Sequence, residues 1–490
     1  RTCHAGRGVG FLVASRKPIT ESLEDNMKDN LLKPEMEALR PALGEVVSLL
    51  ESRVPYGAVS LSSLETTRYQ VENSQERVIA GDPTAGAVLT AFDGHTQYEK
   101  GIGGFNRDDI FQGAKDFIAG IEFQKNGKLD PGKERRGDFQ TKMEHDPALV
   151  PTQEKLEYLR EMNRRVNKID SKIVNARVGY VEFRQKSVFR NRAADLAQDI
   201  QRVHMSIMVT VMGEKGVVFD WTSKCGTAGL EILTFSDEEL EKLVKNAIKL
   251  LDAGRIEPGE YTVVTAPGVS GVIAHESFGH GVETDMFLKE RAKAANYIGK
   301  RVGSNLVNIF DDPSFPGAFG SYFFDDEGMA AKSTQIVKEG IFERGLTDNY
   351  SATVLGLERS PNGRRQDFTR KIYPRMTNTF FGSGDLSVEE LIGKVDDGIY
   401  IPKVSSGMED PKGWGIQVSG HYGFEIKNGK MTDKMYAPVG LTGYVPDVLE
   451  SISAVSNDFD LSGGYCGKGT KETVQVTDGG PHLLMKVRLG

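Results

Sequence analysis

Residues 261–280 read YTVVTAPGVSGVIAHESFGH, and this stretch determines how the second half of the chain begins. Its first part, YTVVTAP, is rich in β-branched residues and ends at a proline, which predicts a strand. The rest, GVSGVIAHESFGH, follows directly and predicts a helix. Because the short Pro/Gly connector RIEPGE precedes this strand-to-helix unit, we expect a domain boundary near residue 255.

The predicted helix carries His275, Glu276 and His280 in a chain with only eight histidines. Random order gives the pattern H-E-x-x-x-H about 0.01 times per chain of this composition. Histidines five residues apart diverge by about 140° on an ideal α-helix, which spoils chelation of one ion. Since Gly279 tolerates an altered backbone, we expect a π-type or broken turn between the two histidines.

A catalytic zinc site needs a third protein ligand and one position for water. Cys466, in the Gly-rich GGYCGKG, is the best candidate, although an inert buried cysteine is the simpler interpretation. Cys225 belongs to the first half of the chain, and His421 favours a packing role in a strand. Glu276 has the chemistry of a general acid/base for a metal-bound water that attacks a carbonyl.

Hydrophobic periodicity predicts the other elements. Ser236 with Glu239 and Ser387 with Glu390 form capping boxes that mark the starts of two helices. The expected elements are helices over 35–50, 152–170, 237–251 and 387–395, short strands over 56–97, and an antiparallel meander over 172–191 and 202–221.

With 490 residues, the chain exceeds the size at which one core usually stops growing, so we expect two domains in an α+β fold. A charged stretch at 126–146 favours an exposed loop or insertion. The expected parts are an irregular segment at 1–35, an N-terminal α+β mixed-sheet domain at 36–254 and a β-rich C-terminal domain at 255–490 that carries the metal-site helix.

Composition excludes several classes of function. The 61 basic and 69 acidic residues give a net charge of −8, which argues against nucleic acid as a partner. No stretch approaches the 18 apolar residues of a membrane span. The three cysteines, Cys3, Cys225 and Cys466, are scattered and odd in number, so we expect a reducing, cytoplasmic location rather than a disulfide framework.

Taken together, these motifs resemble the TldD/PmbA family, also called modulators of DNA gyrase. TldD-type members are zinc metallopeptidases that carry a His-Glu and Gly-His motif and a late Cys-Gly-Lys. The matching elements are His275, Glu276, Gly279 and His280, CGK at 466–468, DDEG at 325–328, NGRR at 362–365, PRMTNT at 374–379 and DGIYIP at 397–402. The resemblance is strong over about residues 255–480. Before residue 255 it is looser and is limited to the general arrangement of the chain.

The resemblance implies that His275, His280 and Cys466 bind zinc and that Glu276 is the catalytic acid/base. Iron also accepts histidine and cysteine ligands, so it stays an alternative metal. The resemblance further implies unfolded or extended peptides as substrates, with the maturation of peptide precursors as one role. It also implies a dimer, either with a second copy or with a PmbA-type subunit that lacks the metal motif.

Arg375 and Asn378 in PRMTNT are candidate donors to a developing oxyanion or to a peptide backbone, although such residues near strand ends more often serve turns or solvent. Two other functions stay open at this point. One is a zinc amidohydrolase that acts on a small acyl group, and the other is a non-catalytic regulatory or binding subunit. Exposed strand edges favour extended peptides, because they pair with any peptide backbone.

Overall fold

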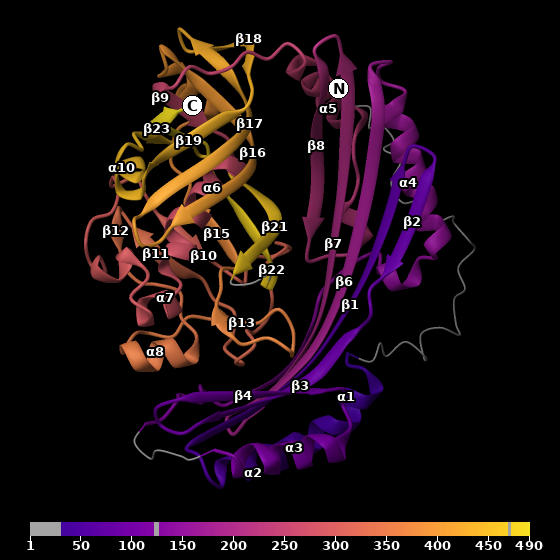
Figure 1. Ribbon diagram of the computed structural model, residues 1–490, viewed down its shortest axis with the longest axis vertical. Helices are drawn as coiled ribbons and strands as arrows, with labels where there is room; N and C mark the ends of the chain where they lie inside the picture. Colours follow the sequence, from indigo (N-terminus) through magenta and orange to yellow (C-terminus); the bar gives the residue numbers. More distant parts are fainter. Residues whose placement is uncertain (1–30, 122–126, 469–471) are drawn as a thin grey trace, which may run out of the picture.

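The computed structural model describes residues 31–121, 127–468 and 472–490 (Figure 1). A long sheet runs through the N-terminal half, and the C-terminal half forms a lobe beside one face of that sheet. The expected combination of helices and sheets is confirmed. Residues 1–30 of the predicted irregular segment, with Cys3, and Asn126 of the charged stretch lie outside the described residues.

Three long antiparallel strands dominate the first sheet: β1 (Tyr56–Glu72), β6 (Ile173–Asn191) and β7 (Ala194–Gly213). The strand order is β4-β3-β1-β6-β7-β5, with β2 on β1 and β8 on β7. The shorter strands are β2 (Gln75–Ala80), β3 (Thr84–Phe92), β4 (Gln97–Gly103), β5 (Arg135–Gln140) and β8 (Gly216–Gly226). The predicted antiparallel meander is confirmed, but β1 is one long strand where short ones were expected, and β7 begins at Ala194 rather than at 202.

Helices cover this sheet at both ends (Figure 1). At one end, α2 and α3 pack apolar residues such as Val46 and Ile110 against β1 and β3. At the other, α4 and α5 bury Leu159 and Leu243 against β6 and β7. The elements are α1 (Pro34–Leu39), η1 (Arg40–Ala42), α2 (Leu43–Glu51), α3 (Arg107–Ala119), η2 (Pro147–Leu149), α4 (Thr152–Asn167), η3 (Leu230–Ile232) and α5 (Asp237–Leu250).

Two sequence predictions need correction. The helix expected over 35–50 is divided by the 3₁₀ turn η1, where Pro41 has no N–H to donate. The charged stretch at 126–146 is not all loop, because β5 pairs in parallel with β7 along its length. Backbone hydrogen bonds to a neighbouring strand need no apolar side chains, so an outer strand can form from RRGDFQ.

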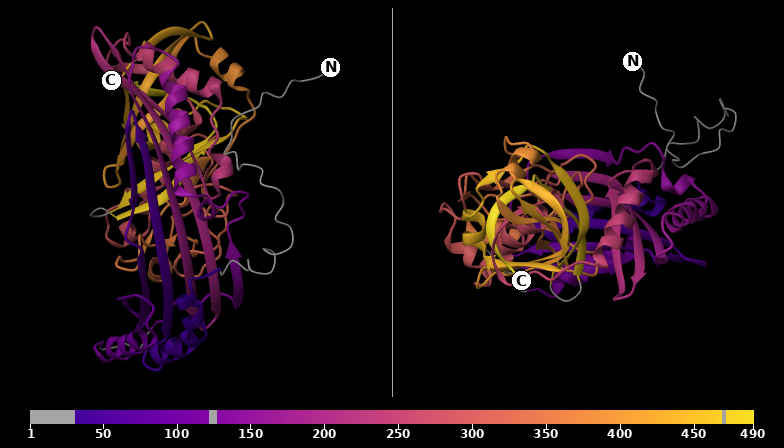
Figure 2. Two further views of the ribbon diagram at one scale, coloured as in Figure 1. Left: turned by 90° about the vertical axis from the view of Figure 1, so that its right-hand side faces the viewer. Right: turned by 90° about the horizontal axis from the view of Figure 1, so that it is seen from above.

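The C-terminal lobe contains a closed barrel, which appears as a ring from above (Figure 2). The order β16-β9-β23-β19-β17 closes because β17 pairs again with β16. Its strands are β16 (Asp397–Asp410), β9 (Gly259–Thr265), β23 (Leu483–Leu489), β19 (Val439–Tyr444) and β17 (Gly415–Lys427), with β18 (Lys430–Tyr436) on β17 and β20 (Ala454–Val455) on β23.

A second sheet in the lobe has the order β12-β11-β10-β15-β22-β21. Its strands are β10 (Ile309–Asp311), β11 (Thr334–Lys338), β12 (Ile341–Phe342), β15 (Asn378–Phe381), β21 (Asp460–Lys468) and β22 (Glu472–Gly480). The other short elements of the lobe are α7 (Asp285–Leu288), η5 (Lys293–Asn296), α8 (Asn349–Leu355), β13 (Gly363–Arg364), β14 (Tyr373–Pro374), α9 (Val388–Gly393) and α10 (Val445–Glu450). Of these, α9 and α10 contact strands of the barrel sheet.

Between the barrel and this second sheet lies α6 (Pro267–Phe278), which follows β9 as the sequence predicts. Apolar residues Val269, Ile273 and Phe278 belong to the core of the lobe. A helix that packs on several sides needs apolar residues around most of its circumference rather than along one stripe. None of the helices within the described ranges is long and apolar enough to cross a membrane.

Candidate metal centre

The two histidines face each other because α6 breaks off between them. The helix ends at Phe278, Gly279 takes φ −101° and ψ −81°, and His280 begins the 3₁₀ turn η4 (His280–Val282). The ring centroids of His275 and His280 lie 5.0 Å apart at an interplanar angle of 79°. The predicted broken turn is therefore confirmed, as a helix end followed by a 3₁₀ turn.

Only glycine fits at position 279. A Cβ there would lie 1.9 Å from Met376 Sδ and 2.3 Å from the His275 carbonyl oxygen. The requirement comes from close packing rather than from a left-handed backbone, because φ is negative. The packing of Met376 against this turn therefore helps to aim His280 at the same point as His275.

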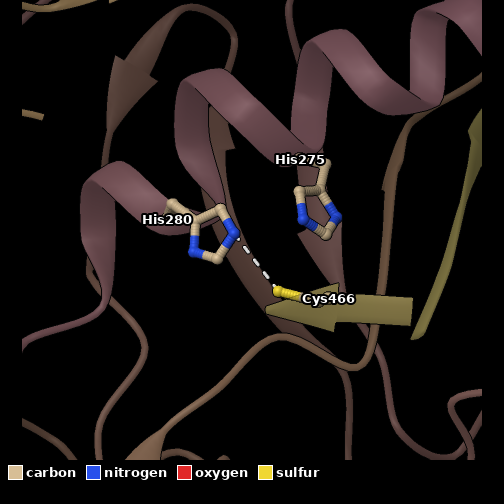
Figure 3. Close-up of side chains that lie close together, drawn as sticks. All are labelled: His275, His280 and Cys466. Carbon is tan, nitrogen blue, oxygen red and sulfur yellow. Dashed lines mark hydrogen bonds between the residues drawn. The ribbon is translucent and has the colours of Figure 1, made fainter. Parts of the chain in front are cut away.

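Cys466 of β21 completes the cluster (Figure 3). Its Sγ lies 3.2 Å from His280 Nε2, and one ligand atom from each of His275, His280 and Cys466 lies within 4.8 Å of the other two. Nitrogen and sulfur ligands of one tetrahedral zinc are about 3.5 Å apart. The structure therefore brings together the three residues that the sequence nominates, although they are 191 positions apart at the extremes.

A carboxylate lies behind each imidazole. His275 Nδ1 is 2.6 Å from Asp478 Oδ1, and His280 Nδ1 is 3.2 Å from Glu283 Oε2. When Nδ1 donates to a carboxylate, the lone pair of Nε2 faces the opposite side of the ring. This arrangement is typical of metal-binding histidines, since the carboxylate fixes both the tautomer and the ring orientation.

Lys468 and Arg375 hold the outer side of the cluster. Lys468 Nζ is 3.0 Å from Glu283 Oε2 and 2.5 Å from Asp285 Oδ1, so the lysine of the CGK motif forms ion pairs with two buried carboxylates. Burial opposes ionisation of Glu283, but Lys468 and His280 outweigh it and hold its pKa well below the usual range. Arg375 Nη2 donates to the Cys466 carbonyl at 2.9 Å and lies 3.5 Å from its Sγ.

The negative charge of the cluster suits a cation. Burial disfavours the Cys466 thiolate, yet the neighbouring His280 and His275 hold the pKa of this thiol well below its usual value. Burial likewise disfavours a charged His280, but Glu283 and Cys466 raise its pKa to about 10. A metal ion replaces protons on such ligands, because it binds thiolate and neutral imidazole.

The open side of the cluster faces a cavity of about 900 Å³. Glu276 lies on its wall, and burial raises the pKa of this carboxyl group. Glu409 lines the same cavity, and burial raises its pKa to about 7 despite the opposing effect of His280. The wall also includes residues 221–223 of β8, 402–409 of β16, and 460 and 462–467 of β21.

Each of these three strand segments has an unpaired edge in the described part of the chain. β8 pairs only with β7, β21 pairs only with β22, and β16 pairs only with β17 beyond Ile401. Free backbone N–H and C=O groups at strand edges accept a further strand. The carbonyls of Trp221 and Cys466 already accept from Lys403 and Arg375, so the cavity offers the remaining edge groups of these segments.

Arg375 and Asn378 lie away from this cavity wall. Arg375 is buried behind Cys466, as described above. Asn378 is also buried, and its amide donates to the Asp312 carbonyl at 2.6 Å and to Ser321 Oγ at 2.8 Å. Both side chains are already bonded to the protein, so neither reaches a peptide in the cavity in this arrangement.

Sequence reasoning missed Asp478, Glu283 and Glu409. Glu283 carried a signal, because it follows His280 by three residues and therefore lies one 3₁₀ turn away. Asp478 in VTDGG and Glu409 in GMED carried none, since their approach depends on the pairing of β21 with β22 and on the path of β16.

The fold and this cluster define an α+β protein with a candidate His-His-Cys metal centre, and comparison with known proteins gives its family. Residues 145–254 match the PmbA/TldA metallopeptidase central domain, and residues 258–488 match the PmbA/TldA metallopeptidase C-terminal domain. The chain belongs to the TldD/PmbA family.

Relatives with curated names support a metallopeptidase family. A protein of Methanothermobacter thermautotrophicus named a metalloprotease is 34% identical over 69% of this chain and 74% of its own length. A protein of Saccharolobus solfataricus named a zinc metalloprotease TldD homolog is 29% identical over 68% of this chain and 75% of its own. The name of the second relative assigns zinc to that protein.

Solved structures share the fold. A putative modulator of DNA gyrase from Bacteroides thetaiotaomicron superposes with a TM-score of 0.74, at 17% identity over 94% of this chain and 99% of its own. TldE from Thermococcus kodakarensis gives a TM-score of 0.70, also at 17% identity, over 93% of this chain and 100% of its own. The architecture is therefore shared by proteins with little sequence in common.

Proposed function

We propose that this chain is a zinc-dependent peptidase that hydrolyses peptide bonds in unfolded or extended peptides. The observation that carries the proposal is the placement of the cluster. His275 and Cys466, which are buried, and His280, which is half-buried, form a three-ligand set that opens into a large cavity, and Glu276 lies on the wall of that cavity. Three strand edges line the same space.

The residues present fit a zinc ion. His275 and His280 would hold it through Nε2 and Cys466 through Sγ, while Asp478 and Glu283 fix the two rings. A bound zinc would polarise the scissile carbonyl and lower the pKa of water at the open position. Iron accepts the same ligands and stays the alternative metal.

Glu276 acts as general base and then as general acid. Its carboxylate takes a proton from the attacking water as the oxygen bonds to the carbonyl carbon. The same proton then passes to the amide nitrogen as the C–N bond breaks, which releases the amine. A raised pKa, which burial gives Glu276, suits a group that must both accept and return a proton near neutral pH.

An extended backbone is the feature of the substrate that this cavity recognises. A strand of substrate pairs with β8, β16 or β21 through main-chain hydrogen bonds, which need little side-chain specificity. A folded protein has its backbone groups already paired, so the cavity selects unfolded peptides or peptide precursors. These strand edges also favour a peptide over a small acyl group, because a small acyl group has no extended backbone to pair with them.

The assembly that we propose is a dimer, either of two copies or with a PmbA-type subunit. The solved relative named TldE supports a paired arrangement, since it shares the fold at low identity. The retained ligand set favours a catalytic role for this chain over a purely regulatory one. Because Cys225 and Cys466 are free thiols, we place the protein in a reducing cytoplasm.

The test compares two glutamate variants on a mixture of unstructured peptides, with products identified by mass spectrometry. Glu276→Gln keeps the shape of the side chain and should retain zinc, but hydrolysis should fall by about 10²–10⁴-fold. The control Glu257→Gln, at an exposed connector residue, should cleave as the unmodified protein does. Full activity of the Glu276 variant would remove this residue from the reaction.

A further inference from the structure

A second cavity, of about 220 Å³, lies between the long sheet and the C-terminal lobe. Gln185 and Arg202 line it from β6 and β7, and Arg364 and Tyr322 line it from the lobe. Tyr465 of β21 lines both this cavity and the larger one beside the metal cluster. The two spaces are therefore neighbours on either side of one aromatic ring.

Four arginines of the described residues are buried, and they fall into two kinds. Arg365 lies 2.8 Å from Glu99, and Arg375 lies 3.7 Å from Glu283, so each has a carboxylate partner. Arg202 and Arg364 are 2% and 6% exposed. Within the chain as described, neither makes an ion pair with a carboxylate, and both line the smaller cavity.

The hydrogen bonds of these two arginines go to neutral acceptors. Arg202 donates from Nε to the Phe319 carbonyl at 2.8 Å, from Nη2 to the Ser321 carbonyl at 2.7 Å, and from Nη1 to Gln185 Oε1 at 3.2 Å. Arg364 donates to the carbonyls of Met376 and Gln475. These bonds use three of the five N–H groups of Arg202 and two of the five of Arg364. Among the described residues, neither guanidinium pairs with a carboxylate, and an unpaired buried charge is costly.

The acidic groups on the cavity wall are committed elsewhere. Asp325 lies 3.8 Å from Arg359 and accepts backbone N–H groups, and Asp326 accepts the Arg365 N–H at 2.8 Å. Burial, and then the charge of Arg364, lower the pKa of Arg202 to about 9, although Tyr322 and Asp326 oppose this shift. Arg68, at an exposed position, adds a further positive charge to the lining.

We propose that this cavity binds an oxyanion between Arg202 and Arg364. Guanidinium groups recognise carboxylate, sulfate and phosphate through charge-assisted hydrogen bonds, and the cavity has room for such a group together with water. The oxyanion has two potential sources. One is a free inorganic anion, and the other is a carboxylate of a bound peptide that extends past Tyr465; this second source rests on the proposed peptidase function.

The first experiment follows thermal unfolding of the full chain while sulfate is added at millimolar concentration and constant ionic strength. Binding at about ten times Kd should give a saturable rise in Tm of about 1 °C. Parallel samples contain one unstructured peptide with a glutamate, or the same peptide with glutamine. A rise with the glutamate peptide alone identifies a substrate carboxylate, and a rise with sulfate alone identifies a free anion. No saturable rise in any sample overturns the proposal.

The second experiment supplies the negative charge from within the chain. Gln185→Glu places a carboxylate beside Arg202 Nη1 with almost no change in size. This variant should unfold at a higher temperature in anion-free buffer and lose at least half of the ligand-induced rise. Gln417→Glu, at an exposed strand position, should change neither quantity. A lower Tm for Gln185→Glu, or an undiminished rise, contradicts the assignment, and neither result depends on peptide hydrolysis.

Discussion

Helices α5 and α6 are of similar length but are determined by different interactions. In α5, Ser236 and Glu239 form a capping box, and one stripe of apolar residues packs on the sheet. In α6, Ala266 at the N-cap makes no side-chain hydrogen bond, and the helix ends where Gly279 meets Met376. The comparison teaches that local sequence specifies α5, whereas distant packing specifies the end of α6.

This difference predicts two separable sets of effects. Changes in α5 should lower the free energy of unfolding without altering metal binding, because the helix covers the sheet away from the cluster. Changes at the end of α6 or behind its histidines should alter metal binding first. The variants below test this separation, beginning with the largest expected effect.

Removal of a ligand should have the largest effect. Loss of a residue that hydrogen-bonds to a metal ligand lowers metal affinity roughly 10–100-fold. Cys466→Ser should weaken zinc binding by more than this, because it removes a ligand itself. Competition with a chromophoric chelator measures the affinity. The control Cys225→Ser changes the other described free thiol and should leave zinc affinity as it is. Equal affinities for both variants would exclude Cys466 as a ligand.

Loss of the carboxylate behind His275 should have the next largest effect. Asp478→Asn removes the charge 2.6 Å from Nδ1 while it keeps the size of the side chain, and zinc affinity should fall about 10–100-fold. The same chelator competition applies. Asp447→Asn, at an exposed position in α10, is the matched control. If Asp478→Asn binds zinc normally, then Asp478 does not orient His275.

A methyl group at the break in α6 should disturb both fold and cluster. Gly279→Ala should lower the free energy of unfolding by about 1–3 kcal/mol, because the added carbon overlaps Met376 and the His275 carbonyl. Denaturant titration measures this change. Gly393→Ala, where nothing lies within 4 Å of the added carbon, should cost much less. Equal stability of the two variants would show that close packing does not determine this turn.

The smallest effect should come from the cap of α5. Ser236→Ala removes the side-chain acceptor for the Glu239 N–H and should cost about 1 kcal/mol of unfolding free energy. Zinc affinity should stay the same, in contrast to the variants at α6. Ser236→Thr keeps the acceptor and should restore most of the stability. A loss of zinc in Ser236→Ala would contradict the claim that α5 affects stability alone while α6 affects metal binding.

The same contrast explains what the sequence predicts well. The capping boxes at Ser236 and Ser387 mark α5 and α9, and alternation marks β6 and β7, because these signals are local. The broken turn after His275 was also predictable, since two histidines five apart cannot chelate from a regular helix. For the capped helices and the alternating strands, the hydrogen-bonding and packing signals lie within a few neighbouring residues, whereas the broken turn follows from the requirement that both histidines bind one ion.

Other features depend on partners far along the chain. β5 forms from a charged stretch because β7 offers a free edge, and the barrel closes because β16 meets β17. Asp478 approaches His275 only through the pairing of β22 with β15 and β21. In each case the deciding contact joins segments that are distant in the sequence, so no local sequence pattern predicts it.

The central claim is that two imidazoles and one thiolate bind a single zinc ion. X-ray absorption at the zinc edge of the loaded chain tests it most directly. The expected spectrum contains one sulfur at about 2.3 Å and at least two imidazole nitrogens at about 2.0–2.1 Å, and the sulfur disappears in Cys466→Ser. A spectrum without sulfur, or one unchanged in that variant, would contradict the account.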